Sequence, residues 1–245
     1  MNKTAIIIPS RLNALRLPNK PLKLINGKEM ILHVHDAAVR AEIGDVIVAT
    51  PNVEIFNIVK KHGGHAQITR SNHKTGSDRI FEVFEKKLEK SVDTIINLQG
   101  DMPNINSKSI KNLADHLNRN SCEIATLASR LDLKKEAQDE NICKVVTTGD
   151  ISQYSFAEAL DFYRLPANMN FDFTYHHIGI YAFTNKALMR YVGLKRSKLE
   201  ISRNLEQLRA LENKMKINVG YTEELPLSVD TEEDFLKVKK IMEKK

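Results

Sequence analysis

Short apolar runs alternate with segments of helical spacing through most of the first half of the chain. Residues 4–8 are mainly β-branched and stop abruptly at Pro9, which predicts a buried strand. Further strands are predicted at 45–50, 65–68, 93–98, 123–129, 143–147 and 216–220, and helices at 30–41, 52–61, 77–90, 107–119, 184–191, 199–212 and 231–244. This alternation favours an α/β fold with a mainly parallel sheet and helices on both of its faces.

The pattern changes between residues of about 150 and 220, where aromatic residues are denser and clean strand–helix units are fewer. We expect this segment to form a smaller lobe, inserted in a single α/β domain that spans residues 1–245. The lobe exceeds what a minimal sheet needs to cover itself. It is therefore expected either to cover a binding site or to join two copies of the chain, and we expect a homodimer.

The composition is ordinary for a globular enzyme, with 42% hydrophobic and 28% charged residues in 245. No apolar stretch approaches the roughly 18 residues that span a bilayer, and the first residues lack a secretory pattern. Cys122 and Cys143 form no CxxC pair, which argues for a reducing cytoplasm and against a zinc site. The net charge of +6 is modest and dispersed, so neither nucleic-acid binding nor membrane insertion is expected.

Three cations, Arg11, Arg16 and Lys20, lie on the loop that follows the first predicted strand. In an open α/β sheet, ligands bind at the carboxyl ends of the strands, where this loop begins. Its charge suits a polyanion, and a nucleoside triphosphate is the commonest one. The alternative is a basic loop that is only solvated.

Two aspartates are candidate ligands of a divalent metal. Asp101 follows a buried strand and is preceded by Gly100, which permits close approach of the backbone. Asp230 lies just before a capping box formed by Thr231 and Asp234. Mg²⁺ is typically bound by one or two carboxylates together with phosphate oxygens of a substrate. The alternatives are a turn residue for Asp101 and a residue at the start of a helix for Asp230.

Residues 71–79 combine small and polar side chains with Gly76 at the start of a predicted helix. Backbone N–H groups at such a helix start can hold a phosphate or contact the edge of a base. The alternative is an ordinary helix start, with Ser77 as the N-cap and Arg79 on the surface. His73, taken alone, is more typical of a loop histidine than of a catalytic one.

Seven motifs occur in an order that resembles one family. They are Ile8-Pro9-Ser10-Arg11, Arg16-Leu17-Pro18-Asn19-Lys20-Pro21-Leu22, Thr75-Gly76-Ser77-Asp78-Arg79, Asn97-Leu98-Gln99-Gly100-Asp101, His177-Ile178-Gly179-Ile180-Tyr181, Leu205-Glu206-Gln207-Leu208-Arg209 and Val229-Asp230-Thr231. Together they resemble the 3-deoxy-manno-octulosonate (Kdo) cytidylyltransferases, or CMP-Kdo synthetases, over nearly the whole chain. The resemblance implies a Rossmann-like nucleotidyltransferase sheet with an inserted dimerisation or lid lobe, and it also suggests a homodimer.

The resemblance also implies a reaction. The anomeric hydroxyl of Kdo attacks the α-phosphorus of CTP, pyrophosphate leaves, and the product CMP-Kdo supplies lipopolysaccharide biosynthesis. Such a step needs charge neutralisation and alignment more than covalent chemistry by the protein. The cofactor that the resemblance implies is Mg²⁺.

The family's site residues carry over by position. The implied catalytic residues are Arg11, Lys20, Asp101 and Asp230, of which the two aspartates hold Mg²⁺. The implied nucleotide-binding residues are Pro9, Ser10, Arg11, Arg16, Lys20, Gly76, Ser77, Arg79 and Gln99, and those from 76 to 79 contact cytosine. The implied sugar-binding residues are Gln99, His177, Tyr181, Glu206 and Gln207. Alternatively, His177 and Tyr181 are strand core, and Glu206 and Gln207 form an exposed helix face.

The chain departs from the family pattern at several positions. Ser10 stands where alanine is usual, and Met102 and Arg203 each stand where glutamate is usual. The segment 155–159 lacks the family's arginine, a natural partner for the sugar carboxylate. Arg164 is expected to replace it only if the loop is re-routed.

Three alternatives to a Kdo cytidylyltransferase remain at this point. One is an enzyme that uses CTP with another acid sugar, such as an amino-substituted Kdo or a sialic acid. Another is a paralogue that binds nucleotide but has lost transfer. The last is a basic nucleic-acid-binding protein, which only the charge excess supports.

Overall fold

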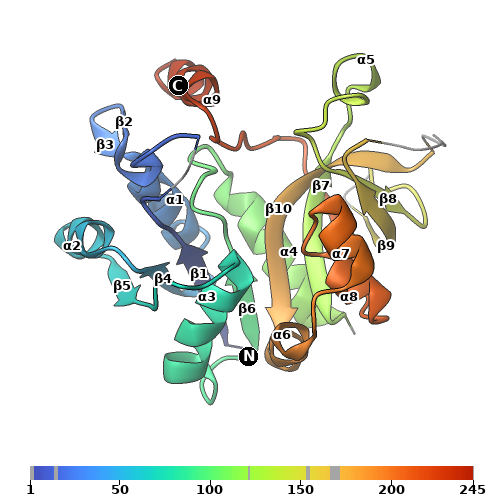
Figure 1. Ribbon diagram of the computed structural model, residues 1–245, viewed down its shortest axis with the longest axis horizontal. Helices are drawn as coiled ribbons and strands as arrows, with labels where there is room; N and C mark the ends of the chain where they lie inside the picture. Colours follow the sequence, from blue (N-terminus) through green and yellow to red (C-terminus); the bar gives the residue numbers. More distant parts are fainter. Residues whose placement is uncertain (1–2, 14–15, 121, 153–154, 166–171, 245) are drawn as a thin grey trace. The chain divides into compact units, whose positions relative to one another are not determined.

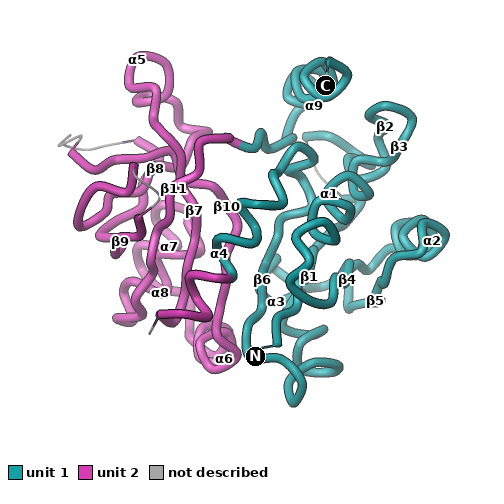
Figure 2. Tube along the Cα trace, turned by 180° about the vertical axis from the view of Figure 1, so that it is seen from behind, with its two compact units in different colours: residues 1–114, 226–245 teal, residues 115–225 magenta. Residues whose placement is uncertain are grey.

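The computed structural model describes residues 3–13, 16–120, 122–152, 155–165 and 172–244. The chain divides into two compact units (Figure 2). Unit 1 comprises Met1–Ala114 and Pro226–Lys245, and unit 2 comprises Asp115–Leu225. The predicted lobe of about 150–220 falls within unit 2.

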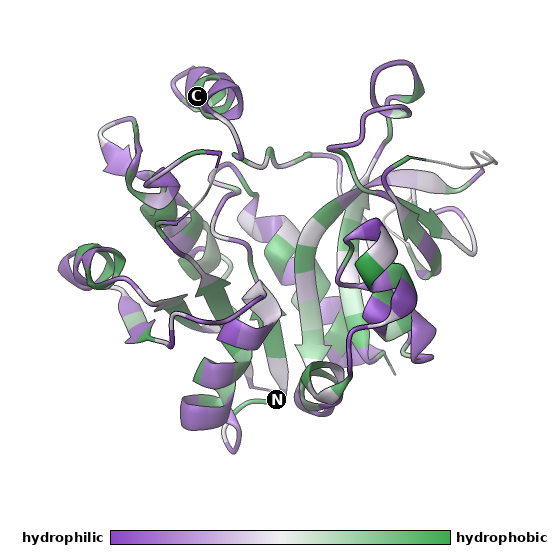
Figure 3. Cartoon of the chain, in the orientation of Figure 1, coloured by the Kyte–Doolittle hydropathy of each residue, from purple (hydrophilic) through white to green (hydrophobic). Residues whose placement is uncertain are grey.

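Unit 1 contains a parallel sheet in the strand order β5-β4-β1-β6 (Figure 1). The strands are β1 (Thr4–Pro9), β4 (Gly44–Thr50), β5 (His65–Ile68) and β6 (Thr94–Asn97). Every residue of β1 is buried, as its continuous hydrophobicity predicts (Figure 3). Because these strands are parallel, the loops after β1, β5 and β6 lie at the same edge of this sheet.

The helices α1 (Met30–Val39), α2 (Val53–Lys61) and α3 (Gly76–Val83) pack against this sheet. The predicted helix 77–90 continues beyond α3 as a π-helical turn, η2 (Phe84–Leu88). The remaining elements of this part of the chain are η1 (Lys20–Leu22), the hairpin β2 (Leu24–Ile25) and β3 (Lys28–Glu29), α4 (Ser107–Arg119) and α9 (Glu232–Met242).

One hydrophobic cluster joins the N-terminal loop of unit 1 to α9. Its buried members are Leu17, Ile25, Met30, Val229, Phe235 and Val238. Leu17 and Val229 are close in sequence to the predicted site residues Lys20 and Asp230. Burial of this cluster therefore fixes the two segments that carry those residues against each other.

Unit 2 contains the strands β7 (Ile124–Ser129), β8 (Lys144–Thr147), β9 (Phe156–Tyr163), β10 (Thr174–Thr184) and β11 (Ile217–Tyr221). Their order is β10-β7-β11-β9-β8, and β8 also pairs with β10. Only the β11–β7 pair is parallel within these described strands, and the other pairs are antiparallel. The parallel arrangement predicted from the sequence thus applies to unit 1. The short connection from β8 to β9 suits antiparallel pairing, because parallel neighbours need a longer crossover.

The helices of unit 2 are α5 (Leu133–Glu136), α6 (Asn185–Gly193), α7 (Lys198–Arg203) and α8 (Leu208–Glu212). The single helix predicted at 199–212 is wrong. Asn204 has a left-handed backbone with φ of 52° and ends α7, so α8 begins as a separate helix. Nowhere in the described residues is there a helix long and apolar enough to span a membrane.

Candidate active site

Lys20 connects the two predicted metal-binding aspartates. The residue before it, Asn19, adopts a left-handed conformation that turns the basic loop into η1. The Lys20 ammonium then donates to the main-chain oxygen of Val229 at 2.6 Å, to Asp101 Oδ2 at 3.1 Å and to Asp230 Oδ1 at 3.3 Å. Its side chain is only 12% exposed, so these contacts are partly shielded from water.

Asp101 occupies a turn directly after the loop that follows β6. A Cβ atom at Gly100 would lie 3.0 Å from the Pro9 carbonyl oxygen and 3.2 Å from Ile31 Cδ1, so this position requires the close approach that glycine permits. The main-chain oxygen of Asp101 also accepts a hydrogen bond from Val229 N at 2.9 Å. This bond holds the segment before Asp230 beside Asp101.

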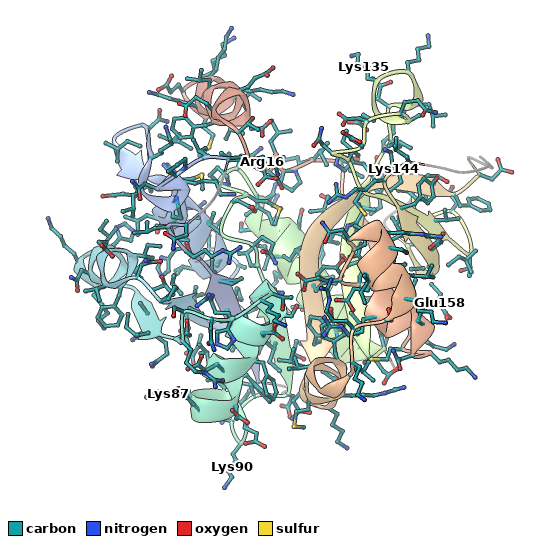
Figure 4. All side chains as sticks on the ribbon, in the orientation of Figure 1. Arg16, Lys87, Lys90, Lys135, Lys144 and Glu158 are labelled. Carbon is teal, nitrogen blue, oxygen red and sulfur yellow. The ribbon has the colours of Figure 1, made fainter. Side chains whose placement is uncertain are left out.

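Asp230 lies directly before the N-cap of α9, Thr231. The predicted capping box is confirmed, since Thr231 Oγ1 accepts from Asp234 N and the Asp234 carboxylate accepts from Thr231 N. Asp234 thus serves the helix start, and the Asp230 carboxylate is directed elsewhere. It forms ion pairs with Lys20 and with Arg16 Nη2, the latter at 3.0 Å (Figure 4 labels Arg16).

This arrangement fits a hard divalent cation. Two carboxylates and one carbonyl oxygen converge on the position of the Lys20 ammonium, and Mg²⁺ prefers oxygen ligands of this kind. A different group, His35, Asp36 and His62, also has ligand atoms within 4.8 Å of one another. Its carboxylate is already paired with Lys28 at 2.6 Å, and its nitrogen donors suit softer metals than Mg²⁺.

Arg11 is exposed on the loop after β1. The loop is held by hydrogen bonds from Ser10 N to Ala49 O at 2.9 Å and from Leu12 N to Asn52 Oδ1 at 3.0 Å. Arg11 lies close enough to Arg79 to affect its ionisation: desolvation first, and then the Arg11 charge, lower the pKa of Arg79. A cationic group beside another cation is a suitable place for a polyanion.

The start of α3 packs against the other residues predicted to bind nucleotide. A Cβ at Gly76 would lie 3.3 Å from Pro9 Cγ and 3.6 Å from both terminal side-chain atoms of Gln99. The Gln99 amide in turn donates to Asn97 Oδ1 at 3.3 Å. The helix start thus lies beside the residues that follow β1 and β6.

The alternative of an ordinary helix start, with Ser77 as the N-cap and Arg79 on the surface, is wrong on both points. The N-cap is Thr75, whose hydroxyl accepts from Asp78 N at 3.0 Å, and Ser77 lies buried within the first turn. Arg79 is not on the surface, since it is only 3% exposed. Its Nη1 donates to Thr69 Oγ1 at 2.5 Å and to the carbonyl of Arg70 at 3.0 Å. Arg79 therefore fixes the loop that leads into α3.

His177 and Tyr181 come together on β10 in unit 2. His177 Nε2 lies 3.0 Å from Thr126 Oγ1 and 3.1 Å from the Tyr181 hydroxyl. Desolvation lowers the pKa of His177 to about 3 and raises the pKa of Tyr181 well above its ordinary value. Both side chains are therefore neutral at physiological pH, and they offer hydrogen bonds rather than charge.

Gln207 is buried, so the alternative of an exposed helix face is wrong for it. Its amide lies 3.5 Å from Cys143 Sγ. The carbonyl of Glu206 accepts from the Tyr191 hydroxyl at 3.0 Å. These contacts attach the segment between α7 and α8 to α6 and to the residue before β8.

A buried ion pair that sequence reasoning missed supports this segment. Glu200 is fully buried, and its carboxylate accepts from Arg209 Nε at 2.8 Å and Arg209 Nη2 at 2.6 Å. Arg196 Nε also donates to Glu200 at 3.0 Å. The pair ties α7 to α8 on both sides of Glu206 and Gln207. The capping box of Ser197 and Glu200 was the available signal for the α7 start, but nothing local indicated the partner on α8.

Arg164 follows β9 directly and lies near the predicted sugar-binding residues of unit 2. Desolvation raises the pKa of Cys143, and the Arg164 charge opposes that rise. After desolvation and the His176 charge, the Arg164 charge also lowers the pKa of His177. Arg164 Nη1 donates to the carbonyls of Asn141 and Glu140, at 2.7 and 3.1 Å. Its own carbonyl accepts at 2.6 Å from the buried Lys144 ammonium (Figure 4 labels Lys144). Arg164 is thus held in a defined position.

Two of the other departures from the family pattern, Met102 and Arg203, have structural explanations. Met102 is 1% exposed, so its side chain belongs to the core and not to the surface beside Asp101. Arg203 Nη1 donates to both Asp161 oxygens, at 2.7 and 2.8 Å, and to the carbonyl of Phe162 at 3.0 Å. Arg203 therefore joins α7 to β9.

A family model described as "Cytidylyltransferase" matches residues 5–217. The chain is accordingly an enzyme of the nucleotidyltransferase class, and it transfers cytidylyl groups.

Curated relatives and a solved structure narrow the class. The chain is 42% identical over 98% of its length to a 3-deoxy-manno-octulosonate cytidylyltransferase of Rhodopseudomonas palustris, and covers 98% of that protein. It is 43% identical over 95% of its length to one of Brucella ovis, and covers 92% of it. A structure of CMP:2-keto-3-deoxy-manno-octonic acid synthetase complexed with CTP superposes with a TM-score of 0.89, at 33% identity and 99% coverage of both chains. The chain belongs to the 3-deoxy-manno-octulosonate cytidylyltransferase family.

Proposed function

We propose that this enzyme transfers CMP from CTP to Kdo, releases pyrophosphate and so forms CMP-Kdo for lipopolysaccharide biosynthesis. The observation that carries the proposal is the convergence of Asp101, Asp230 and Lys20 at one end of the parallel sheet. Nucleotide binding alone does not need two carboxylates beside a basic loop. The names of the relatives support CTP and Kdo as the substrates.

The residues of unit 1 bind the triphosphate in this proposal. Arg11, Arg16 and Lys20 neutralise the phosphates and stabilise the negative charge that develops on pyrophosphate as it leaves. Asp101 and Asp230 would hold Mg²⁺, which supplies charge neutralisation at the α-phosphate when bound. Lys20 then exchanges its carboxylate contacts for contacts with phosphate oxygens.

The base and ribose are bound by the remaining nucleotide residues of unit 1. Gly76 and Ser77 place backbone groups of the first turn of α3 beside cytosine, and Arg79 acts by fixing the preceding loop. Pro9 and Gln99 lie beside that helix start, which supports their assignment to the nucleotide, and Ser10 follows Pro9 directly. Gln99 is also proposed to contact the sugar.

The residues of unit 2 bind the sugar acid. His177 and Tyr181 supply neutral hydrogen-bonding groups, and Glu206 and Gln207 supply polar groups from the start of α8. Arg164 supplies the positive charge for the sugar carboxylate that the segment 155–159 lacks, and this role is supported by its proximity to His177 and Cys143.

Pyrophosphate release tests the proposal. The enzyme is incubated with Mg²⁺ and CTP, with or without Kdo, and ATP, GTP and UTP serve as controls. Release should require both CTP and Kdo. Release with an amino-substituted Kdo or a sialic acid, but not with Kdo, would overturn the sugar assignment. CTP binding without release with any sugar would indicate a paralogue that has lost transfer.

We further propose a cytoplasmic homodimer built from single-domain subunits. Large apolar side chains of unit 2, including Leu160, Leu165 and Phe173, are substantially exposed, which supports a contact with a second copy. Cys122 and Cys143 are both free thiols, as expected in a reducing compartment. Sedimentation at micromolar concentration should show a dimer, and a monomer would refute this assignment.

A further inference from the structure

Helix α3 carries a buried carboxylate that the proposed reaction does not use. The Glu82 side chain is 2% exposed, and no metal or substrate role has been assigned to it. Ionised carboxylates are rarely buried to this degree unless several groups compensate for the lost hydration. The partners of Glu82 therefore indicate what it does.

One carboxylate oxygen of Glu82 faces the loop that leads into α3. Oε2 accepts a hydrogen bond from Arg70 N at 3.0 Å and contacts His73 Nε2 in a short hydrogen bond. The other oxygen, Oε1, accepts from Lys86 Nζ at 2.6 Å, one turn further along the same helix. Glu82 thus divides its two oxygens between the loop and its own helix.

Glu82 is ionised in this environment. Desolvation raises its pKa, but the hydrogen bonds from Lys86, His73 and the Arg70 backbone outweigh that effect and lower the pKa to about 2. Because an ionised carboxylate only accepts hydrogen bonds, His73 must carry its proton on Nε2. The bond therefore fixes both the orientation and the tautomer of His73.

Arg79 holds the beginning of the same loop. It lies one turn before Glu82 on α3 and donates to Thr69 Oγ1 and to the carbonyl of Arg70. The peptide units on both sides of Arg70 are therefore bonded to α3, through Arg79 at the carbonyl and through Glu82 at the N–H. At its other end, the loop passes through Thr75 into the helix start beside Pro9 and Gln99.

We propose that Glu82, through His73 and the Arg70 backbone, is a positioning residue that fixes the loop 70–75 for nucleotide binding and base selection. This inference rests on the proposed function, because the loop contributes only if the nucleotide lies at the start of α3. A preorganised loop binds more tightly, since its ordering does not have to be completed at the moment of binding.

Glu82→Gln tests the role directly. The amide keeps the size of the side chain but replaces one carboxylate oxygen by an NH₂ donor. That donor faces either the N–H groups of the loop or the Lys86 ammonium, which are donors themselves, so the hydrogen bonds on that side are lost. We expect KM for CTP to rise by about tenfold, with kcat changed by less than about threefold, because a lost charge-assisted hydrogen bond has this size. The preference for CTP over UTP should fall by a similar factor.

Lys86→Met is the matched control. Lys86 contacts the same carboxylate but not the loop, and its side chain is 54% exposed. This variant should keep both KM for CTP and the preference for CTP over UTP. His73→Leu removes only the hydrogen bond between His73 and Glu82, in the middle of the loop. This variant replaces Glu82→Gln in the test if Glu82→Gln does not fold. His73→Gln, which retains a side-chain N–H donor, should restore most of the binding that His73→Leu loses.

Limited trypsin digestion separates this proposal from the proposed function. Arg70 and Lys74 are exposed sites within the loop. Glu82→Gln should accelerate cleavage after Arg70 and after Lys74 several-fold, while cleavage outside the loop is unchanged. If the wild-type enzyme transfers no cytidylyl group, the proposed function fails, whereas the cleavage result still decides whether Glu82 holds the loop. Folded Glu82→Gln with unchanged cleavage and unchanged KM for CTP would overturn the inference.

Discussion

Ser10 carries a buried hydroxyl. Its removal should raise the stability of the free enzyme and weaken the binding of CTP. Ser10 lies directly after β1 and is 6% exposed. Within the part of the chain that the structure describes, its Oγ is the one buried side-chain oxygen or nitrogen without a hydrogen-bond partner. The hydroxyl lies between Pro9 and Arg11, where we propose that the nucleotide binds. The related family usually has alanine at this position.

The expected magnitudes follow from the lost and gained hydrogen bonds. A buried hydroxyl without a partner costs roughly 1–3 kcal/mol, so Ser10→Ala should stabilise the free enzyme. For a chain of this size, 1 kcal/mol corresponds to about 2–4 °C in Tm, so a rise of at least about 2 °C is expected. If the hydroxyl binds CTP, its loss should weaken CTP binding by roughly two- to tenfold.

Thermal unfolding with and without CTP measures both effects in one assay. The Tm of the free Ser10→Ala enzyme should rise, and the additional increase produced by saturating CTP should become smaller. A hydroxyl with a purely structural role would change only the first quantity. A lower Tm for the free variant, or an unchanged increase with CTP, would refute the reasoning.

The remaining predictions concern four other side chains. Asp230→Asn should lower kcat by roughly 10²–10³-fold with an unchanged circular dichroism spectrum, and near-normal turnover would remove Asp230 from the metal site. Lys20→Ala should raise KM for CTP and slow pyrophosphate release; an unchanged rate would mean that the basic loop is only solvated. Glu200→Gln should lower the free energy of unfolding in urea by about 3 kcal/mol or more, because it leaves Arg209 buried without its counter-ion, and a loss below about 1 kcal/mol would contradict this. Lysine and histidine partners outweigh desolvation and lower the pKa of Asp36 from 3.8 to about 2, so its stabilising contribution is complete above pH 4 and lost as the pH falls through 2. Between pH 4 and pH 2 the free energy of unfolding should fall by about 2 kcal/mol less in Asp36→Asn than in the wild-type enzyme. An equal fall in both proteins would show that the pKa of Asp36 is not lowered.

The nucleotide side of the site could be predicted from the sequence because its residues follow buried strands. Pro9 to Lys20 and Gln99 to Asp101 each continue a run of hydrophobic residues, and parallel strands bring such segments to one edge. The capping box before α9 was equally visible, because Thr231 and Asp234 are only three residues apart. Local patterns of this kind do not depend on distant partners.

The features that could not be predicted depend on contacts between distant segments. Nothing near Lys20 indicates that its ammonium would contact both Asp101 and Asp230. Glu82 and Glu200 resemble ordinary helix-surface residues, and only tertiary packing buries them. Thr75 and Ser77 are both good N-caps, and the packing of the helix start decides between them.

The strand β9 was not predicted, and β10 was anticipated only as the alternative in which His177 and Tyr181 are strand core, because polar and aromatic residues interrupt simple alternation in both strands. Glu158 and Asp161 lie within β9, where charged side chains are unusual, and each is paired with a cation, Lys216 and Arg203 respectively. The pairing of β10 with β7 is also irregular, with a register shift between Ile178 and Tyr181. Whether a segment with charged residues forms a strand depends on partners from other segments, such as Lys216 and Arg203 here.

The most direct test of the central claim is a ³¹P NMR time course of CTP, Mg²⁺ and Kdo with the enzyme. The proposed reaction cleaves between the α- and β-phosphorus atoms. The three CTP resonances should therefore decline together, while one phosphodiester resonance and pyrophosphate appear in equal amounts. Neither product should form without Kdo. Formation of CDP and inorganic phosphate, or an unchanged CTP spectrum in the presence of Kdo, would contradict the proposed function.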